Sequence, residues 1–260
     1  MGKLLRASRQ ATKFVFAFGL IFTAMNSPIS AAEIKLISVG TVSPVLHDLI
    51  PEYERQSGNK VQVNFGNPAV TLERLTKGDP ADIVMVAGAL WDQAEKVGRL
   101  KPETKTVLPA TPYSIGMKPG TKPSAAATPN DVKRLLEQVQ SIALVDRSPS
   151  IPILMQSAEK MGIARQVEAK TKIYSTGGAI AEALAHGEVD MGVTTLSELV
   201  AVHEVVVLGP VPSEVLPLKA TTTAAITKDG FATGDAIAFL QFLTSPNAMA
   251  VFKAKGFEIN

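Results

Sequence analysis

The sequence predicts an α/β fold in which mostly parallel sheets carry helices on both faces. Short apolar segments such as Ile34–Val39 and Ile83–Val86 have the length and the β-branched content of buried strands. Segments with the apolar spacing of a helix follow them, as in Val42–Gln56. Parallel strands need such crossovers, so the alternation predicts parallel pairing. The chain has no cysteine, so this fold is held by packing without disulfides.

The same reasoning places the remaining elements along the chain. We expect strands at Ile34–Val39, Lys60–Phe65, Ile83–Val86, Ser114–Lys118, Ser141–Val145, Gln166–Tyr174, Met191–Thr194 and Val205–Leu208. We expect helices at 42–56, 71–77, 91–97, 130–140, 151–161, 177–186, 234–243 and 246–255. Gly98 and Gly256 follow two of these helices, in the position where glycine commonly ends a helix.

The first 32 residues resemble an export signal. Basic residues from Lys3 to Lys13 precede the apolar run Phe14–Ala24, and small residues at Ser30–Ala32 suit a signal peptidase. The run is too short for a membrane anchor, which needs about 20 apolar residues. We therefore expect cleavage after Ala32, no membrane insertion, and a mature monomer in the periplasm.

Charge argues against a nucleic-acid role. The chain has 26 basic and 24 acidic residues. Four of the basic residues and none of the acidic ones lie in the first 32, which leaves 22 minus 24, or −2, for the mature part. A nucleic-acid-binding protein needs a basic surface that this balance does not provide.

Polar and small residues follow several predicted strands, where ligands bind in open α/β sheets. Helices that start at such positions present free backbone N–H groups, which suit an anion. The candidates for binding a small anion in these loops are Thr41, Val42, Asn67, Ala69, Ala87, Arg147, Ser148 and Gly177. Each loop alone is also an ordinary turn or helix cap. Five loops of this kind, all after strands, favour a shared anion pocket.

Other kinds of site find little support. The sequence has no phosphate-binding loop, no dinucleotide motif, and no histidine pair at metal-ligand spacing, so we expect no metal and no cofactor. Arg147 could bind a carboxylate with two hydrogen bonds, although a solvated loop arginine explains it equally well. His47 and Glu198 are the candidates for proton transfer. A surface position for His47 and a first-turn helix position for Glu198 are the simpler explanations.

Three blocks of residues carry a resemblance to a known family. Gly78-Asp79-Pro80-Ala81-Asp82-Ile83, the block Ala183–Val193, and Phe242-Leu243-Thr244-Ser245-Pro246 resemble the periplasmic molybdate-binding proteins. The resemblance covers nearly all of 34–258 in order. It implies a two-lobed type II solute-binding fold, with 33–112 plus 224–260 in lobe 1 and 113–223 in lobe 2. Crossings near Pro112–Ser114 and Lys219–Thr223 would form the hinge.

The chain departs from that family at the positions that hold the oxyanion. The family uses serines in the first two loops and a tyrosine after the Gly-Val strand. Here Thr41, Asn67 and Thr195 stand at those positions. Thr41 is a conservative change, whereas Asn67-Pro68-Ala69 removes hydroxyl groups and a backbone donor from the second loop. Each hydrogen bond that a tetrahedral oxyanion loses would cost about 1 kcal/mol or more in binding. The segment Thr194–Leu199 resembles a divergent subgroup that includes the periplasmic aconitate isomerases.

Two functions stay open on the sequence. The first is a binding protein that captures a small anion, an oxyanion or a polycarboxylate, for an ABC-type permease of the inner membrane. The second is a cofactor-independent isomerase that moves the double bond of an unsaturated polycarboxylate. That reaction needs a base to remove a proton and an acid to return it.

Overall fold

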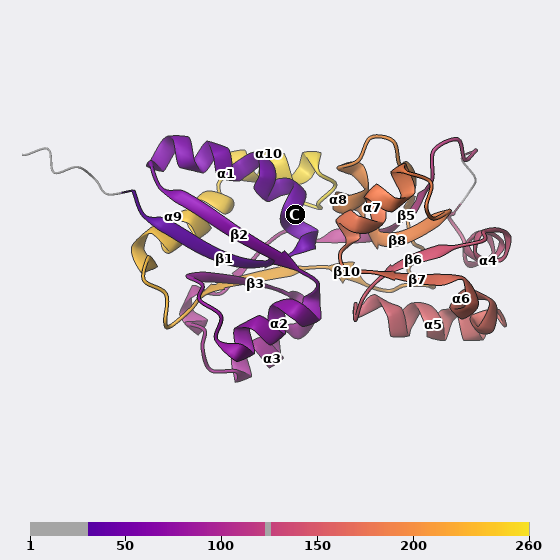
Figure 1. Cartoon of the computed structure of the whole chain (residues 1–260), viewed down its shortest axis with the longest axis horizontal. Coiled ribbons are helices and arrows are strands. Elements are labelled where there is room, and N and C mark those ends of the chain that lie inside the picture. Colours follow the sequence, from indigo (N-terminus) through magenta and orange to yellow (C-terminus); the bar gives the residue numbers. More distant parts are fainter. Residues whose placement is uncertain (1–30, 123–125, 260) are drawn as a thin grey trace, which may run out of the picture. The chain divides into compact units, whose positions relative to one another are not determined.

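The computed structural model describes residues 31–122 and 126–259 of the chain (Figure 1). It has two sheets with helices on both faces of each, which confirms the predicted α/β class. The predicted export signal falls almost wholly on residues outside those described. Within 31–122 and 126–259, no helix combines the length and the apolar character that a membrane crossing requires.

The first sheet has five strands in the order β2-β1-β3-β11-β4. They are β1 (Glu33–Val39), β2 (Lys60–Gly66), β3 (Ile83–Ala87), β4 (Thr106–Val107) and β11 (Thr222–Ile226). Strands β2 and β3 pair with β1 in parallel, with Val39 opposite Gly66 at the end of the β1–β2 pair. Strand β11 runs antiparallel to both β3 and β4. The carboxyl ends of β1, β2 and β3 therefore share one edge.

The second sheet has six strands in the order β10-β5-β8-β6-β7, with β9 paired to β5. They are β5 (Thr111–Met117), β6 (Ile142–Val145), β7 (Thr171–Tyr174), β8 (Met191–Thr195), β9 (Val206–Pro210) and β10 (Lys219–Ala220). Strands β7 and β8 pair with β6 in parallel. Strand β5 runs antiparallel to β8, β9 and β10.

Ten α-helices lie within the described residues. They are α1 (Ser43–Ser57), α2 (Pro68–Lys77), α3 (Trp91–Lys96), α4 (Pro129–Gln138), α5 (Ser150–Lys160), α6 (Ala164–Lys170), α7 (Gly177–Ala185), α8 (Leu196–Val200), α9 (Thr233–Leu243) and α10 (Pro246–Ala254). Short 3₁₀ turns form η1 (Gly40–Val42), η2 (Gly88–Leu90) and η3 (Pro102–Thr104). Proline at the first position of α2, α4 and α10 fits the start of a helix, where the missing N–H has no partner to lose.

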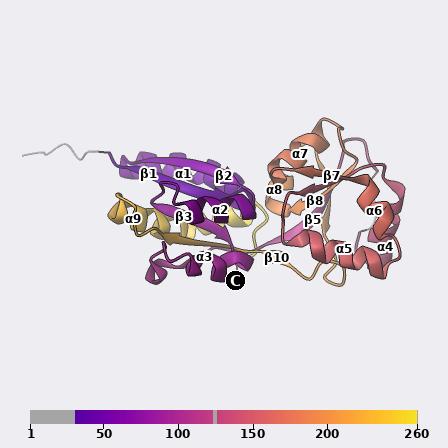
Figure 2. The same ribbon diagram turned by 60° about the horizontal axis from the view of Figure 1, so that its bottom comes forward.

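Alternate side chains of each strand enter opposite cores. In the first sheet, Leu36 and Met85 pack against α1, α9 and α10, whereas Ile37 and Val84 pack against α2 and α3. In the second sheet, one core joins the strands to α4, α5 and α6, and the other joins them to α7 and α8 (Figure 2). Burial on both faces explains why these strands read as continuous apolar runs.

Three sequence expectations were wrong. The sheets are mixed, not mostly parallel, because β5 and β11 run antiparallel to their neighbours. Strand β11 (TTAAI) was missed, since threonine and alanine give it no apolar run. Residues 166–170, expected to be strand, belong to α6, and only Thr171–Tyr174 is extended. A single buried residue, Val167, left α6 without a clear helical stripe.

The chain passes between the two sheets at two places. It leaves β4 in the first sheet for β5 in the second, and it returns from β10 to β11. Strands β5 and β10 pair here, with Pro112 opposite Lys219. These are the crossings that the sequence indicated near 112–114 and 219–223. The lobe boundaries and the hinge motion at these crossings stay predictions.

Candidate functional site

A small pocket lies where strands of both sheets end and helices begin. Its cavity measures about 30 Å³, which is room for one or two water molecules. Loops after β1, β2, β6, β7 and β8 contribute to it, together with β5. The lining residues are Gly40, Thr41, Gly66, Asn67, Pro68, Tyr113, Val145, Ser148, Thr176, Gly177, Thr194, Thr195 and Glu198. Only Glu198 among these residues carries an ordinarily ionised side chain.

Glu198 is the buried centre of this pocket. The side chain of Thr194 donates a hydrogen bond of 2.8 Å to its Oε2 atom, and that of Thr195 donates one of 2.7 Å. Thr195 Oγ1 also lies 3.0 Å from Ser197 Oγ, which donates to the backbone carbonyl of Thr41 at 2.9 Å. Glu198 is 5% exposed. The end of β8 and the start of α8 thus fix the carboxyl group beside the loop after β1.

Two glycines leave the space that the carboxyl group needs. A Cβ atom at Gly177 would lie 2.1 Å from both Glu198 Oε2 and Thr194 Oγ1. A Cβ atom at Gly40 would lie 2.9 Å from Glu198 Oε1. Real Cβ atoms do not approach oxygen atoms that closely. The position of the Glu198 carboxyl group therefore requires glycine at both positions.

Burial raises the pKa of Glu198 above its ordinary value of 4.5, because the carboxylate loses its hydration. Hydrogen bonds from Thr195, Thr194 and the backbone N–H of Gly178 act in the opposite direction and are weaker. Burial also raises the pKa of the Tyr113 phenol, while contacts with the hydroxyl groups of Ser148 and Ser150 lower it. The charge of Glu198 raises the pKa of Tyr113 further. The pocket thus favours the neutral form of both groups.

Tyr113 was not among the predicted site residues. It sits on β5 directly opposite Thr195 on β8, so the two side chains share one face of the sheet. Thr195 stands at the family's tyrosine position, and Tyr113 on the neighbouring strand lies directly beside it. Its place at the predicted crossing near Pro112–Ser114 was the available signal, since residues at such crossings line the space between the sheets. Thr176 and Thr194, which precede the predicted Gly177 and Thr195, were missed too.

Asn67 caps α2 and contacts the loop that follows β6 of the second sheet. Its Oδ1 atom accepts a hydrogen bond of 2.9 Å from the backbone N–H of Val70, as N-cap residues do. Its Nδ2 atom donates to Asp146 Oδ2 at 3.4 Å. Both ends of the buried amide group are therefore engaged by the protein.

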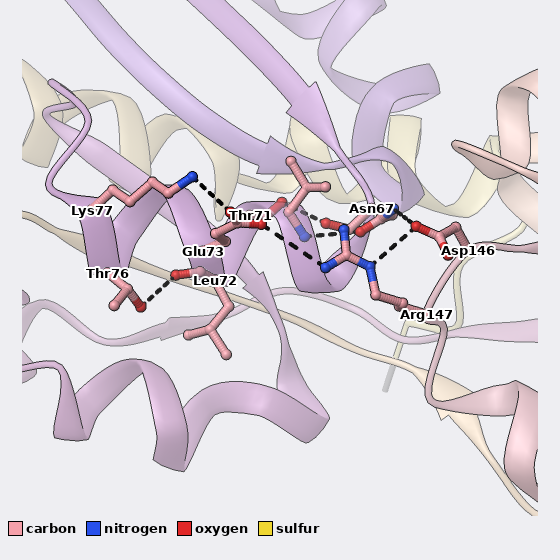
Figure 3. Close-up of polar contacts among 9 residues, drawn as sticks. Asn67, Thr71, Leu72, Glu73, Thr76, Lys77, Asp146 and Arg147 are labelled. Atoms are coloured by element: carbon pink, nitrogen blue, oxygen red, sulfur yellow. Dashed lines mark hydrogen bonds and ion pairs between the residues drawn. The ribbon is translucent and has the colours of Figure 1, made fainter.

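Arg147 is bound to protein carboxylates instead of lining the pocket (Figure 3). Its Nε atom donates to Asp146 Oδ2 at 3.1 Å, and its Nη1 atom lies 3.9 Å from Glu73 Oε2 on α2. Its side chain is 53% exposed. Its backbone has a φ of 48°, the only left-handed residue other than glycine among those described. A contact between Arg147 and a ligand stays a prediction.

The predicted binding residues separate into two groups. Six of the predicted residues line the pocket, namely Thr41, Asn67, Ser148, Gly177, Thr195 and Glu198. Val42 is instead buried in the core under α1, and Ala69, Ala87 and Arg147 are absent from the lining. His47 lines a neighbouring cavity, described below, on the exposed side of α1. The roles of all of them in binding stay predictions.

The lining of the site is rich in groups that form hydrogen bonds. Within residues 31–122 and 126–259, no group of three or more His, Asp or Glu side chains could hold a metal ion. Hydroxyl and amide groups dominate the pocket, and these donate hydrogen bonds to anions. Asp82, directly before β3, lies at the other ends of the strands and accepts hydrogen bonds from the backbone of Lys35 and Ala232.

Comparison with known proteins identifies the family. Residues 34–258 match the family described as bacterial extracellular solute-binding protein. The chain belongs to this family. The extracellular solute-binding fold also appears in the periplasmic molybdate-binding protein of Azotobacter vinelandii, with a TM-score of 0.73 and 18% identity over 87% of this chain and 99% of that one. The type II periplasmic binding fold that the sequence predicts is therefore confirmed.

Two further similar proteins are named for different activities, one for binding and one for catalysis. The sulfate-binding protein SubI of Mycobacterium tuberculosis has a TM-score of 0.68 and 19% identity over 87% of this chain and 86% of that one. An aconitate isomerase from a Pseudomonas species is 23% identical over 249 residues, which cover 92% of this chain and 94% of that protein. This solute-binding chain thus resembles both binding proteins and an enzyme.

Proposed function

We propose that this solute-binding protein captures a small anion, an oxyanion or a polycarboxylate, in the pocket around Glu198 and delivers it to an ABC-type transporter. The observation that carries the proposal is the convergence of five predicted binding residues, together with Glu198, on one pocket. Hydroxyl groups of Thr41, Ser148 and Thr176 are its donors. Charge-assisted hydrogen bonds to such donors contribute about 1.5–3 kcal/mol each.

None of the described residues that line the pocket is basic, so the protonation state of Glu198 determines whether an anion is repelled or bound there. Two unit charges 4 Å apart repel by about 4 kcal/mol at an effective dielectric constant of about 20. An ionised Glu198 would therefore oppose an anion, whereas a neutral one can donate a hydrogen bond to it. The raised pKa of Glu198 supports the neutral form. We expect anion binding to take up a proton wherever Glu198 is ionised beforehand.

A thermal-shift panel tests this proposal. The panel contains molybdate, sulfate, phosphate, citrate, and cis- and trans-aconitate. A ligand present at 100 times its dissociation constant stabilises the protein by about 2.7 kcal/mol. We expect at least one of these anions to raise the melting temperature, and the effect to become smaller as the pH rises through the raised pKa of Glu198. No shift with any of them at any pH would contradict the proposal.

One observation favours a second function, isomerisation of an unsaturated polycarboxylate such as aconitate. Glu198 is a buried carboxyl group with a raised pKa, as general acid–base catalysts often are. In its ionised form it would take a proton from the methylene carbon of the substrate. The double bond then moves one position, and the neutral Glu198 returns the proton at the other end of the allylic unit. The relative from Pseudomonas supports this chemistry by its name.

Absorbance separates the two functions. Conversion of cis- into trans-aconitate at catalytic protein concentrations supports the isomerase, and Glu198→Gln should then abolish turnover while it preserves the shape of the site. Stoichiometric binding without conversion supports the binding protein alone. Turnover that survives in Glu198→Gln would remove Glu198 from the proton-transfer role.

A further inference from the structure

A second cavity, of about 400 Å³, adjoins the pocket. It lies between α1 and the end of β2 on one side and α7 and α8 on the other. Three residues, Gly40, Thr176 and Glu198, line both this cavity and the pocket. Glu198 therefore stands in the wall between the two spaces.

The sizes of the two spaces limit where a ligand can lie. The pocket has room for one or two water-sized groups, which is too little for a whole polycarboxylate. The adjoining cavity is more than ten times larger, since 400 Å³ divided by 30 Å³ is about 13. It falls within the size range of sites that bind small organic molecules. A polycarboxylate whose charged end occupies the pocket needs an adjoining space of this size for the rest of its chain.

The surfaces of the cavity suit a carbon chain. Pro44, Phe65, Ala201 and Val202 give it an apolar wall. The rings of His47 and Phe65 meet edge to face in this lining, with their centroids 6.0 Å apart. Glu182 is the other acidic residue of the lining, and it is exposed. A compact inorganic oxyanion would leave this apolar wall without contact.

We propose that the cavity is a second subsite for the same ligand, and that the ligand is an elongated organic acid. One carboxylate enters the pocket near Thr41, Ser148 and Thr195, and the carbon chain lies against Phe65 and Val202. This inference rests on the proposed anion-binding function and narrows its ligand class. Val202 and Phe65 are then specificity-determining residues that contact the body of the ligand and not its charged group.

Filling the cavity tests the inference. Val202→Phe adds a ring from α8's side of the cavity, at a half-buried position that can accept it. Val107→Phe makes the same change on β4, where Val107 is 61% exposed and lines neither cavity. The probes are tricarballylate, a saturated tricarboxylate that cannot undergo a double-bond shift, and sulfate and molybdate as compact anions. Isothermal titration calorimetry measures each dissociation constant.

We expect tricarballylate to bind the wild-type protein more tightly than either compact anion does. We also expect Val202→Phe to weaken that binding at least tenfold, and Val107→Phe to leave it unchanged. Should Val202→Phe fail to fold, Ala201→Leu at an exposed position of the same wall replaces it. Equal binding of tricarballylate by the wild-type protein and the filled variant would overturn the inference. Tighter binding of sulfate or molybdate would overturn it too, and both results would leave anion binding intact. Failure of all three anions to bind would instead overturn the proposed function.

Discussion

Thr195 donates a hydrogen bond of 2.7 Å to the buried carboxyl group of Glu198, three residues further along the chain. The bond joins the last residue of β8 to the short helix α8 and fixes the carboxyl group where loops from both sheets meet. A buried carboxyl group with a raised pKa is costly to ionise. The stability of the protein and its ligand affinity should therefore both depend on the protonation of Glu198.

The first prediction concerns pH and stability. Because burial raises the pKa of Glu198 above 4.5, the folded state binds its proton more tightly than the unfolded state does. Its contribution to stability is complete below pH 4.5 and is lost as the pH rises through the folded-state pKa. We expect the free energy of unfolding of the wild-type protein to fall relative to that of Glu198→Gln as the pH rises above 4.5. Urea unfolding of both proteins across this range measures the difference.

Other carboxyl groups with shifted pKa values are present in both proteins, so their effects cancel when the two are compared. Asp131 and Asp190 have lowered pKa values, held down first by Thr128 and by Lys118 respectively. Their contributions are lost as the pH falls, so they act on the acid side and are common to both proteins. Parallel pH profiles for wild type and Glu198→Gln would show that Glu198 has an ordinary pKa.

The second prediction concerns the glycines at the start of α7. Gly177→Ala places a Cβ atom 2.1 Å from Glu198 Oε2, whereas Gly178→Ala meets only Thr176 Oγ1 at 3.9 Å. We expect Gly177→Ala to destabilise the protein by about 1–3 kcal/mol through overpacking. Gly178→Ala should be neutral or stabilising, because alanine favours helix more than glycine does. Thermal unfolding of the pair measures this, and equal melting temperatures would contradict the packing described for Glu198.

The third prediction concerns the backbone of Arg147. Its ion pairs with Asp146 and Glu73 are exposed and should contribute less than about 1 kcal/mol. Its φ of 48° costs a residue with a side chain about 1–2 kcal/mol, a cost that glycine avoids. We expect Arg147→Gly to be more stable than Arg147→Ala, although both lose the same ion pairs. An alanine variant that is equally stable or more stable in chemical unfolding would contradict a left-handed backbone at residue 147.

The fourth prediction separates the two tasks of Asn67. Asn67→Asp keeps the oxygen that caps α2 but replaces the donor to Asp146 with a second carboxylate beside it. Asn67→Ala removes the cap, which costs about 1 kcal/mol of stability. We expect Asn67→Asp to weaken anion binding more than Asn67→Ala does, because the added negative charge lines the pocket. Calorimetric titration of both variants with one anion compares them, and tighter binding by the aspartate variant would contradict an anion site here.

The sequence was sufficient for the strands that are apolar throughout and for the loops after them. Continuous runs such as Ile83–Val86 report burial on both faces, and the residues after such strands must gather at one edge when the strands are parallel. Strand β11 could not be recognised, because its small and polar residues gain their burial from neighbours on β3 and β4. Tyr113 was missed for a related reason. Its position opposite Thr195 depends on an antiparallel register that no local pattern encodes.

The carboxyl group of Glu198 shows the same limit within the site. The sequence places it in the first turn of a helix, where an acidic residue is favourable on the surface. The structure shows that the side chain is enclosed, because it is buried and Gly40 and Gly177 pack against it. Arg147 was a reasonable anion ligand on the sequence. It pairs instead with the adjacent Asp146 and with Glu73, which is far away in the chain and could not be foreseen as a partner (Figure 3).

The most direct test of the central claim is calorimetric titration of the wild-type protein and of the double variant Thr41→Ala/Ser148→Ala with the anion that stabilises the protein most. Loss of two hydroxyl donors to a charged ligand should cost about 1.5–3 kcal/mol each, which is at least a hundredfold in dissociation constant. We predict saturable binding at one site per chain by the wild-type protein and that loss in a variant that still folds. Undiminished affinity in the double variant would show that the anion binds elsewhere.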